Sequence, residues 1–110
     1  MFKTIRIGTE DYQLRLDIKN LCALEAALKT NPVNVLFRVG NNEIPKLSDL
    51  KLMLHYSLQA LNHGINMEKT ENLFDIYLSE NGDIFDLIAV LSEVVKESGV
   101  ISKKDTETKN

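Results

Sequence analysis

The spacing of the apolar side chains changes once along this chain, near Asp17, and this change limits the fold more than any other feature. Before Asp17, apolar and polar residues alternate in the segments 2–7 and 12–16, which is the period of a β-strand with one buried face. After Asp17, apolar residues recur with the period of an amphipathic helix. The polar segment 8–11 between the two alternating runs suits a hairpin loop. A lone hairpin is only marginally stable in water, so we expect helices to cover its apolar face.

The sequence therefore predicts an α+β fold in which an N-terminal two-stranded antiparallel hairpin packs against four to five helices. Capping residues, glycines and prolines give approximate helix boundaries, because they satisfy or terminate the exposed backbone groups at helix ends. We expect Asp17, Asn66 and Asp83 to act as N-caps. The expected helices span residues 18–29, 32–39, 48–62, 67–79 and 84–97.

The length of 110 residues suits one domain, because two separate cores would each be close to the size at which folding alone is marginal. We expect residues 1–101 to form this single globular domain. Residues 102–110 read SKKDTETKN and contain no apolar side chain, so they have nothing to bury that would offset the entropy lost on ordering. We therefore expect them to form a disordered C-terminal tail.

Few residues in the chain carry the chemistry that a catalytic or metal site needs. His55 and His63 lie on one expected helix, roughly 80° apart around its axis and about two turns apart along it, too far to share a metal ion. Cys22, the only cysteine, falls on the apolar side of its helix, where we expect a small buried hydrophobic side chain. Gly8 and Gly40 are isolated and match no phosphate-binding loop. We predict no catalytic, cofactor-binding or metal-binding residues, and a protein that is not an enzyme.

Charge and hydropathy lead us to expect neither nucleic acid nor membrane as a partner. The 13 basic and 16 acidic residues give a net charge of −3 and an isoelectric point near 5.3, whereas nucleic-acid binding needs a basic excess to displace phosphate counterions. No apolar run approaches the ~18 residues of a membrane span, and the first residues do not resemble a secretory leader. We expect a soluble cytoplasmic protein that binds neither nucleic acid nor membrane, and that needs no cofactor.

The acidic residues are concentrated in one part of the chain. Residues 68–97 contain eight acidic and two basic residues, a balance of −6, whereas residues 1–67 have a balance of +2. A solvated acidic face is the usual explanation for such a bias. The alternative is a binding surface for a basic, helical partner, in which charge would mainly set the association rate and the register.

The last expected helix has a wide apolar face. At 100° per residue, its apolar side chains form a sector around the helix axis, with Val90 at one edge and Phe85 at the other. This sector covers roughly 220° of the helix circumference, well beyond the ~100° that faces one core. Either the helix is central and packs on both sides, or part of this face docks a partner. For the second case, the candidate partner-binding residues are Phe74, Tyr77, Phe85, Ala89 and Val90.

Four segments carry a recognisable pattern of apolar positions. In chain order they are IRIGTEDYQLRLD, NLCALEAAL, LSDLKLMLHYSLQAL and FDLIAVLSEVV. This arrangement resembles the tail assembly chaperones of long-tailed phages and prophages, which open with a short hairpin of the form I-x-I-(G)-x-x-x-Y-x-L and continue with leucine-rich helices. The similarity extends over residues 3–98 and depends on the order of apolar positions rather than on catalytic residues.

The resemblance implies a non-enzymatic function in the host cell cytoplasm. Proteins of this family bind the long, helical, aggregation-prone tape-measure protein, keep it soluble and help tail-tube subunits to assemble around it. They are generally absent from the finished virion. The implied partner is the tape-measure protein, with the tail-tube protein as a second candidate and self-association left open. The alternative function is that of a small helical adaptor or regulatory protein of a prophage, with a single protein partner.

Deletion of residues 102–110 should leave the thermal midpoint of unfolding unchanged within experimental error, because the deletion removes no apolar side chain from a core. Thermal denaturation of the full-length and shortened chains, followed by circular dichroism, measures the difference. A large fall in the midpoint would contradict the expectation of a disordered tail.

Overall fold

The computed structural model describes residues 2–100. Within this range the chain forms a two-stranded antiparallel hairpin followed by five α-helices, so the predicted α+β, mostly helical fold is confirmed. The tail predicted over residues 102–110 lies outside the described residues, as does residue 101, the last of the predicted domain. Both boundaries stay predictions.

Strand β1 (Lys3–Ile7) pairs antiparallel with strand β2 (Glu10–Leu14), with the ends of the two strands opposite each other. The predicted hairpin is confirmed, but the expected loop over 8–11 is wrong, because only Gly8 and Thr9 form the turn. Gly8 has a φ of +67°, a conformation that favours glycine and allows a two-residue hairpin turn. The second strand therefore begins two residues earlier than the alternation suggests.

Five α-helices and one short π-helix follow the hairpin in the described part of the chain. They are α1 (Ile18–Leu28), α2 (Pro32–Gly40), α3 (Leu47–Gln59), α4 (Met67–Ile76), the π-helix η1 (Tyr77–Asn81) and α5 (Ile84–Glu97). The bounds of α1, α2 and α5 agree with the sequence prediction to within one residue. The single helix expected over 67–79 is instead divided into α4 and η1. Between residues 2 and 100, no helix combines the length and the apolar character needed to cross a lipid bilayer.

The three predicted N-caps are confirmed. Asp17, Asn66 and Asp83 each precede a helix in an extended conformation. A side-chain oxygen of each accepts a hydrogen bond from the backbone N–H three residues later, at 3.0, 2.8 and 2.9 Å respectively. These bonds satisfy one of the exposed donors in each first turn. For Asp17 the same bond is the main cause that holds the pKa of the carboxyl below its usual value.

Helix α3 ends at Gln59, three residues earlier than the sequence predicts. The Gln59 amide donates a hydrogen bond to the carbonyl oxygen of Ile65 at 2.8 Å, and the Asn62 amide donates to that of Gln13 at 2.7 Å. These bonds hold the residues after α3 in a loop that folds back along the helix and reaches β2. As a consequence Leu61, which the helical period places in the core, is 40% exposed.

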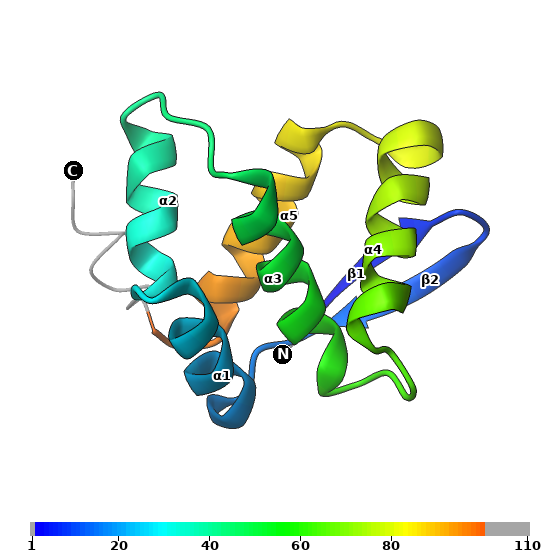
Figure 1. Ribbon diagram of the computed structural model, residues 1–110, viewed down its shortest axis with the longest axis horizontal. Helices are drawn as coiled ribbons and strands as arrows, with labels where there is room; N and C mark the ends of the chain where they lie inside the picture. Colours follow the sequence, from blue (N-terminus) through cyan, green and yellow to red (C-terminus); the bar gives the residue numbers. More distant parts are fainter. Residues whose placement is uncertain (1, 101–110) are drawn as a thin grey trace.

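Helix α3 lies at the centre of the molecule. It contacts α1, α4, α5 and β2, and Figure 1 shows it crossing in front of α5, between α1 and α4. One cluster of buried apolar side chains includes members from both strands, all five α-helices and η1. The fully buried apolar members are Leu14, Leu24, Val35, Leu50, Met53, Leu54, Leu58, Leu87, Leu91, Val94 and Val95. The described elements therefore share one core.

The hairpin packs against this core through one face only. Ile5, Ile7 and Leu14 are buried on the face that the helices cover, whereas Thr4 and Arg6 are exposed. This arrangement follows the period of two in the strand sequences. Figure 1 shows the hairpin beside α4, at the end of the molecule opposite α2.

The π-helix connects the hairpin turn to the helices through Asn81. The Oδ1 atom of Asn81 accepts a hydrogen bond from the Gly8 N–H at 2.6 Å, and its Nδ2 atom donates to the Gly8 carbonyl oxygen at 3.4 Å. The wider π turn ends where the Gly82 N–H donates to the carbonyl oxygen of Tyr77 at 3.0 Å. A side chain late in the sequence thus holds the turn of the N-terminal hairpin.

Asn81→Ala should lower the free energy of unfolding by about 1 kcal/mol, because the mutation removes both hydrogen bonds to the Gly8 backbone. The thermal midpoint should fall by about 4–8 °C. Asn72→Ala is the matched control, since Asn72 is an exposed amide on α4. Chemical denaturation measures both variants, and equal stability of the two would show that the Asn81 contact does not stabilise the hairpin.

Candidate functional site

The five candidate partner-binding residues lie in different environments. Phe74 and Tyr77 belong to the core, with only 9% and 5% of their surface exposed, and Val90 is half-buried against the same core. Phe85 is 62% exposed and Ala89 is also exposed, one turn further along α5. The structure therefore removes Phe74 and Tyr77 from the accessible surface and keeps Phe85 and Ala89 together on one flank of α5.

The wide apolar face of α5 is explained in large part by packing. Leu87, Leu91 and Val94 are buried on this helix, together with Ile88 and Val95. The helix contacts β1, α2 and α3, so it is covered on more than one side, as the first interpretation predicts. The flank that carries Phe85 is the part of the apolar face that stays exposed.

A hollow lies between the start of α5 and the connector from α2 to α3. It is lined by Asn42, Glu43, Ile44, Phe85 and Ile88, and has a volume of about 280 Å³. We call it the α5 hollow. Ile88 is buried, whereas Ile44 and Phe85 are 60% and 62% exposed, so an apolar bottom is flanked by two open apolar side chains. Figure 1 shows the connector and the first turn of α5 on the same, upper side of the molecule.

The sequence analysis does not identify Ile44 as part of this surface. Its only signal is a single apolar residue in the polar connector between Gly40 and Pro45, which has no helical or strand period. The significance of Ile44 depends on the tertiary position of α5, which brings Phe85 to the same hollow.

One acidic side chain lies at the α5 hollow, and two more lie in and before the adjoining first turn of α5. Glu43 lines the hollow, and Asp83 and Asp86 flank Phe85 in the sequence; all three are exposed. Lys46 is the basic residue of the adjoining connector segment. Among the described residues, the ion pairs are formed elsewhere and include none of these three carboxylates. The Asp83 carboxylate caps α5, and the Asp86 carboxylate lies beside Gly82 and Tyr77. The carbonyl oxygen of the exposed Arg38 accepts a hydrogen bond from the Glu43 N–H, and Glu43 is the carboxylate that lines the hollow itself.

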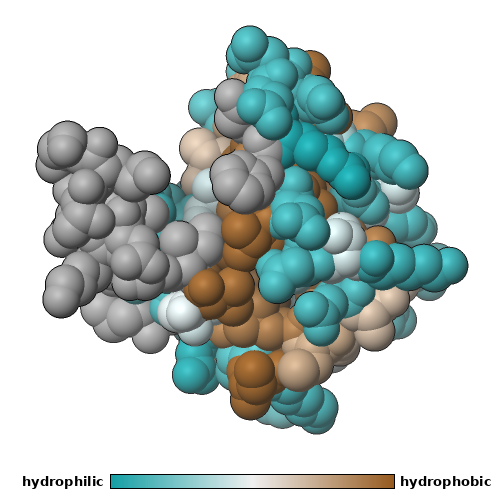
Figure 2. Space-filling model, turned by 90° about the vertical axis from the view of Figure 1, so that its left-hand side faces the viewer, coloured by the Kyte–Doolittle hydropathy of each residue, from teal (hydrophilic) through white to brown (hydrophobic). Residues whose placement is uncertain are grey.

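A second apolar area lies on the face that carries α1 and α2. Figure 2 shows apolar side chains there as a strip between polar ones. Cys22 is exposed, so the prediction that it is buried is wrong, and Ile18 on the same helix is 74% exposed. The physical reason is the packing of α1 against α3, which buries Asn20, Leu21 and Leu24. The buried face of α1 is thereby rotated away from Cys22.

The two histidines do not form a shared site. His55 on α3 is half-buried, and its Nδ1 atom lies 2.8 Å from the buried Thr70 hydroxyl of α4. The Thr70 hydroxyl donates to the Asn66 carbonyl oxygen at 3.1 Å, so His55 joins α3 to the first turn of α4. His63 is exposed in the following loop. Within residues 2–100, no group of three or more His, Cys, Asp or Glu side chains is placed to hold a metal ion.

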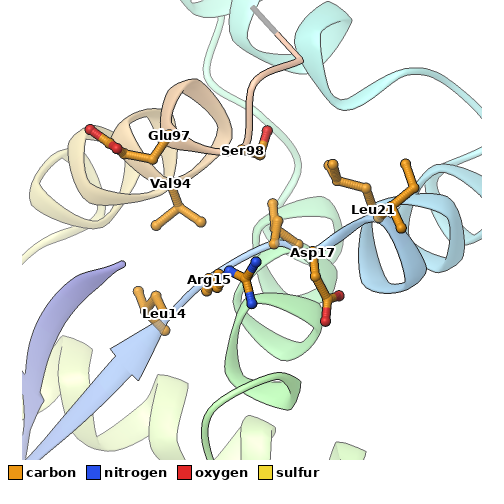
Figure 3. Close-up of a pocket in the computed structure, with 9 residues that line it drawn as sticks. Leu14, Arg15, Asp17, Leu21, Val94, Glu97 and Ser98 are labelled. Atoms are coloured by element: carbon orange, nitrogen blue, oxygen red, sulfur yellow. The ribbon is translucent and has the colours of Figure 1, made fainter. Parts of the chain in front are cut away.

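Another hollow, of about 290 Å³, opens between β2, α1 and the end of α5. Figure 3 shows Leu14 and Val94 facing each other across it, with Arg15 and Asp17 beside them. Its polar groups stabilise the fold: Asp17 caps α1, the Arg15 N–H donates to the Ser57 carbonyl oxygen at 2.9 Å, and the Ser98 hydroxyl donates to a carbonyl oxygen of α5. They do not form a pairing of nucleophile and base.

Comparison with known protein families gives one match that covers residues 1–110, to a family model described as a family of unknown function (DUF6096). No curated protein and no solved structure matches the chain.

His55→Gln should reduce the pH dependence of stability. Burial lowers the pKa of His55 below the value of 6.5 expected in the unfolded chain. Between these two values the unfolded state binds more protons, so the stability of the wild type should fall as the pH decreases below about 6.5. Thermal midpoints measured at about pH 7.5 and about pH 5.5 should therefore differ less in His55→Gln than in the wild type.

His63→Gln is the control for this measurement, because it removes an exposed imidazole from the neighbouring loop. It should retain the pH dependence of the wild type. An unchanged pH dependence in His55→Gln would show that other groups cause the loss of stability in this pH range.

Proposed function

The chain belongs to the DUF6096 family, and we propose that it is a non-enzymatic phage tail assembly chaperone. In this proposal it binds the tape-measure protein, keeps it soluble and promotes assembly of the tail tube. The observation that carries the proposal is the α5 hollow, where Phe85 and Ile44 are 62% and 60% exposed beside the carboxylate of Glu43. The order of apolar segments along the chain, which resembles that of tail assembly chaperones, supports the same conclusion.

The energetics of the exposed aromatic side chain support a binding function for this surface. Burying a phenylalanine that is otherwise exposed contributes about 1.5–3 kcal/mol. A large apolar side chain beside a hollow, with a polar rim, is the arrangement that dominates many protein–protein interfaces. Phe85 is the one large, exposed apolar side chain of α5, and it therefore has the properties of an anchor for a protein partner.

The polar groups support a non-enzymatic function, because three of those with displaced pKa values, Asp17, His55 and Tyr77, have positions that stabilise the fold. Asp17 caps α1, and His55 bonds to Thr70 between α3 and α4. Burial, with smaller contributions from two nearby aspartates, raises the pKa of Tyr77, which lies in the core. Tyr12 of β2 donates a hydrogen bond to Glu10 of the same strand at 3.4 Å, and burial together with that carboxylate raises the pKa of Tyr12.

A small adaptor or regulatory protein with a single partner is the second candidate function. The modest size of the α5 hollow, about 280 Å³, favours it, because one such hollow receives one anchor. The two functions differ in stoichiometry. A chaperone should bind several segments along a long tape-measure protein, whereas an adaptor should bind one segment of its partner.

Phe85→Ser should reduce the capture of the tape-measure protein encoded in the same phage or prophage by about tenfold, because the anchor side chain is lost. Tagged full-length chain and tape-measure fragments are co-expressed, and the recovered fragment is quantified. Ile18→Ser is the matched control, since Ile18 is 74% exposed on α1, away from the α5 hollow. It should bind like the wild type.

Thermal denaturation of both variants verifies that they are folded. The proposal is wrong if the wild type neither captures tape-measure fragments nor increases their solubility. Equal capture by Phe85→Ser and Ile18→Ser would show that the α5 hollow is not the contact surface.

A further inference from the structure

We infer that the α5 hollow binds a basic amphipathic helix of the partner, with one large apolar side chain of that helix inserted between Phe85 and Ile44. This inference rests on the proposed function and adds the chemistry of the partner segment. The segment carries an aliphatic or aromatic anchor, and Lys or Arg side chains on the adjacent turns of the same face.

The size and lining of the hollow suit one inserted side chain. Its volume of about 280 Å³ is close to the lower end of the range for small-molecule pockets, about 300–1,000 Å³, and has room for one large side chain. Ile88 closes the bottom, Phe85 and Ile44 form open apolar walls, and Asn42 and Glu43 supply polar groups at the rim. An apolar centre with a polar rim is the usual form of an interface anchor site.

The charges near the hollow favour a partner segment with positive charge. Glu43 lines the hollow, and Asp83 and Asp86 stand in and before the first turn of α5 beside Phe85; all three are acidic and exposed, against the two basic residues Arg38 and Lys46. No ion pair of the described residues includes these three carboxylates, so a basic partner would form new pairs without breaking existing ones. An acidic partner would meet uncompensated repulsion.

The backbone around the hollow favours a helix over an extended strand. Addition of a strand requires an open sheet edge, and both strands lie in the hairpin at the far end of the molecule from α2 (Figure 1). Phe85 and Ala89 are one turn apart on the exposed flank of α5, and the small Ala89 side chain allows a second helix to approach closely. A helix lying along this flank can insert one side chain into the hollow and place its basic residues near Glu43 and Asp86.

Two synthetic amphipathic peptides of about 20 residues test the inference, a length at which an isolated helix can form. Both have the same leucine-rich apolar face, and their polar faces carry Lys and Arg in one peptide and Glu in the other. Each is titrated into the full-length chain and followed by amide chemical-shift changes. The basic peptide should bind at least tenfold more tightly than the acidic one, with the changes centred on Ile44 and Phe85, and added salt should weaken its binding.

Charge reversal gives the second measurement. The double variant Glu43→Lys, Asp86→Lys should bind the acidic peptide more tightly than the basic one, whereas Glu25→Lys on α1 should retain the wild-type preference. Phe85→Ser should weaken the binding of the basic peptide about tenfold. A lysine at position 86 stands in the first turn of α5 and can destabilise that helix. The single variant Glu43→Lys in the connector avoids this effect, and it should reduce the difference in affinity between the basic and the acidic peptide.

The outcomes separate this inference from the proposed function. Equal affinity for the two peptides, or chemical-shift changes centred away from the α5 hollow, would overturn the inference. If the wild type captures the tape-measure protein and the charge-reversed variant captures it equally well, the proposed function stands and the basic-helix inference fails. If the basic peptide binds at the hollow but no tape-measure fragment is captured, the inference stands and the proposed function fails.

Discussion

The β-hairpin has one apolar face and no larger sheet around it, and much of the molecule serves to cover that face. Ile5, Ile7 and Leu14 lose their contact with water only because α3, α4 and α5 lie against the strands. Two strands alone would be marginally stable. The Asn81 side chain adds a polar attachment at the turn, through its bonds to the Gly8 backbone. Strands and helices therefore depend on each other for stability, although they are separate in the sequence.

Local chemistry could be predicted from the sequence, and features that depend on tertiary contacts could not. Asp17 and Asp83 act as N-caps because their carboxylates reach N–H groups three residues away, a contact that needs no knowledge of the fold. The exposed position of Cys22 depends on which side of α1 packs against α3, and that side is the one with Leu21 and Leu24. The π turn before Gly82 has no period that distinguishes it from an α-helix in the sequence.

In the candidate site, too, the sequence predicts local features but not those that depend on tertiary contacts. An aromatic residue on a helix has the same sequence signature whether it belongs to a core or to a binding surface, and Phe74 and Tyr77 proved to be buried while Phe85 is exposed. Helical spacing gives the relative angles of side chains but not the side on which neighbouring helices pack. Ile44 could be recognised as a member of the site only after α5 was placed beside its connector.

Acidic residues at and near the α5 hollow also affect whether two copies of the chain could pair through it. Two copies that met through the α5 hollow around a two-fold axis would bring identical surfaces together, so Glu43 and Asp86 of one copy would approach the same carboxylates of the other. Such like-charge contacts oppose self-association, whereas a basic helix converts them into attraction. The carboxylates would thus protect Phe85 from pairing with a second copy and select a partner of opposite charge. In this proposal Asp83 and Asp86 of the acidic segment 68–97 belong to the same recognition surface as the exposed flank of α5, whereas Glu71 and Glu93 pair with lysines elsewhere.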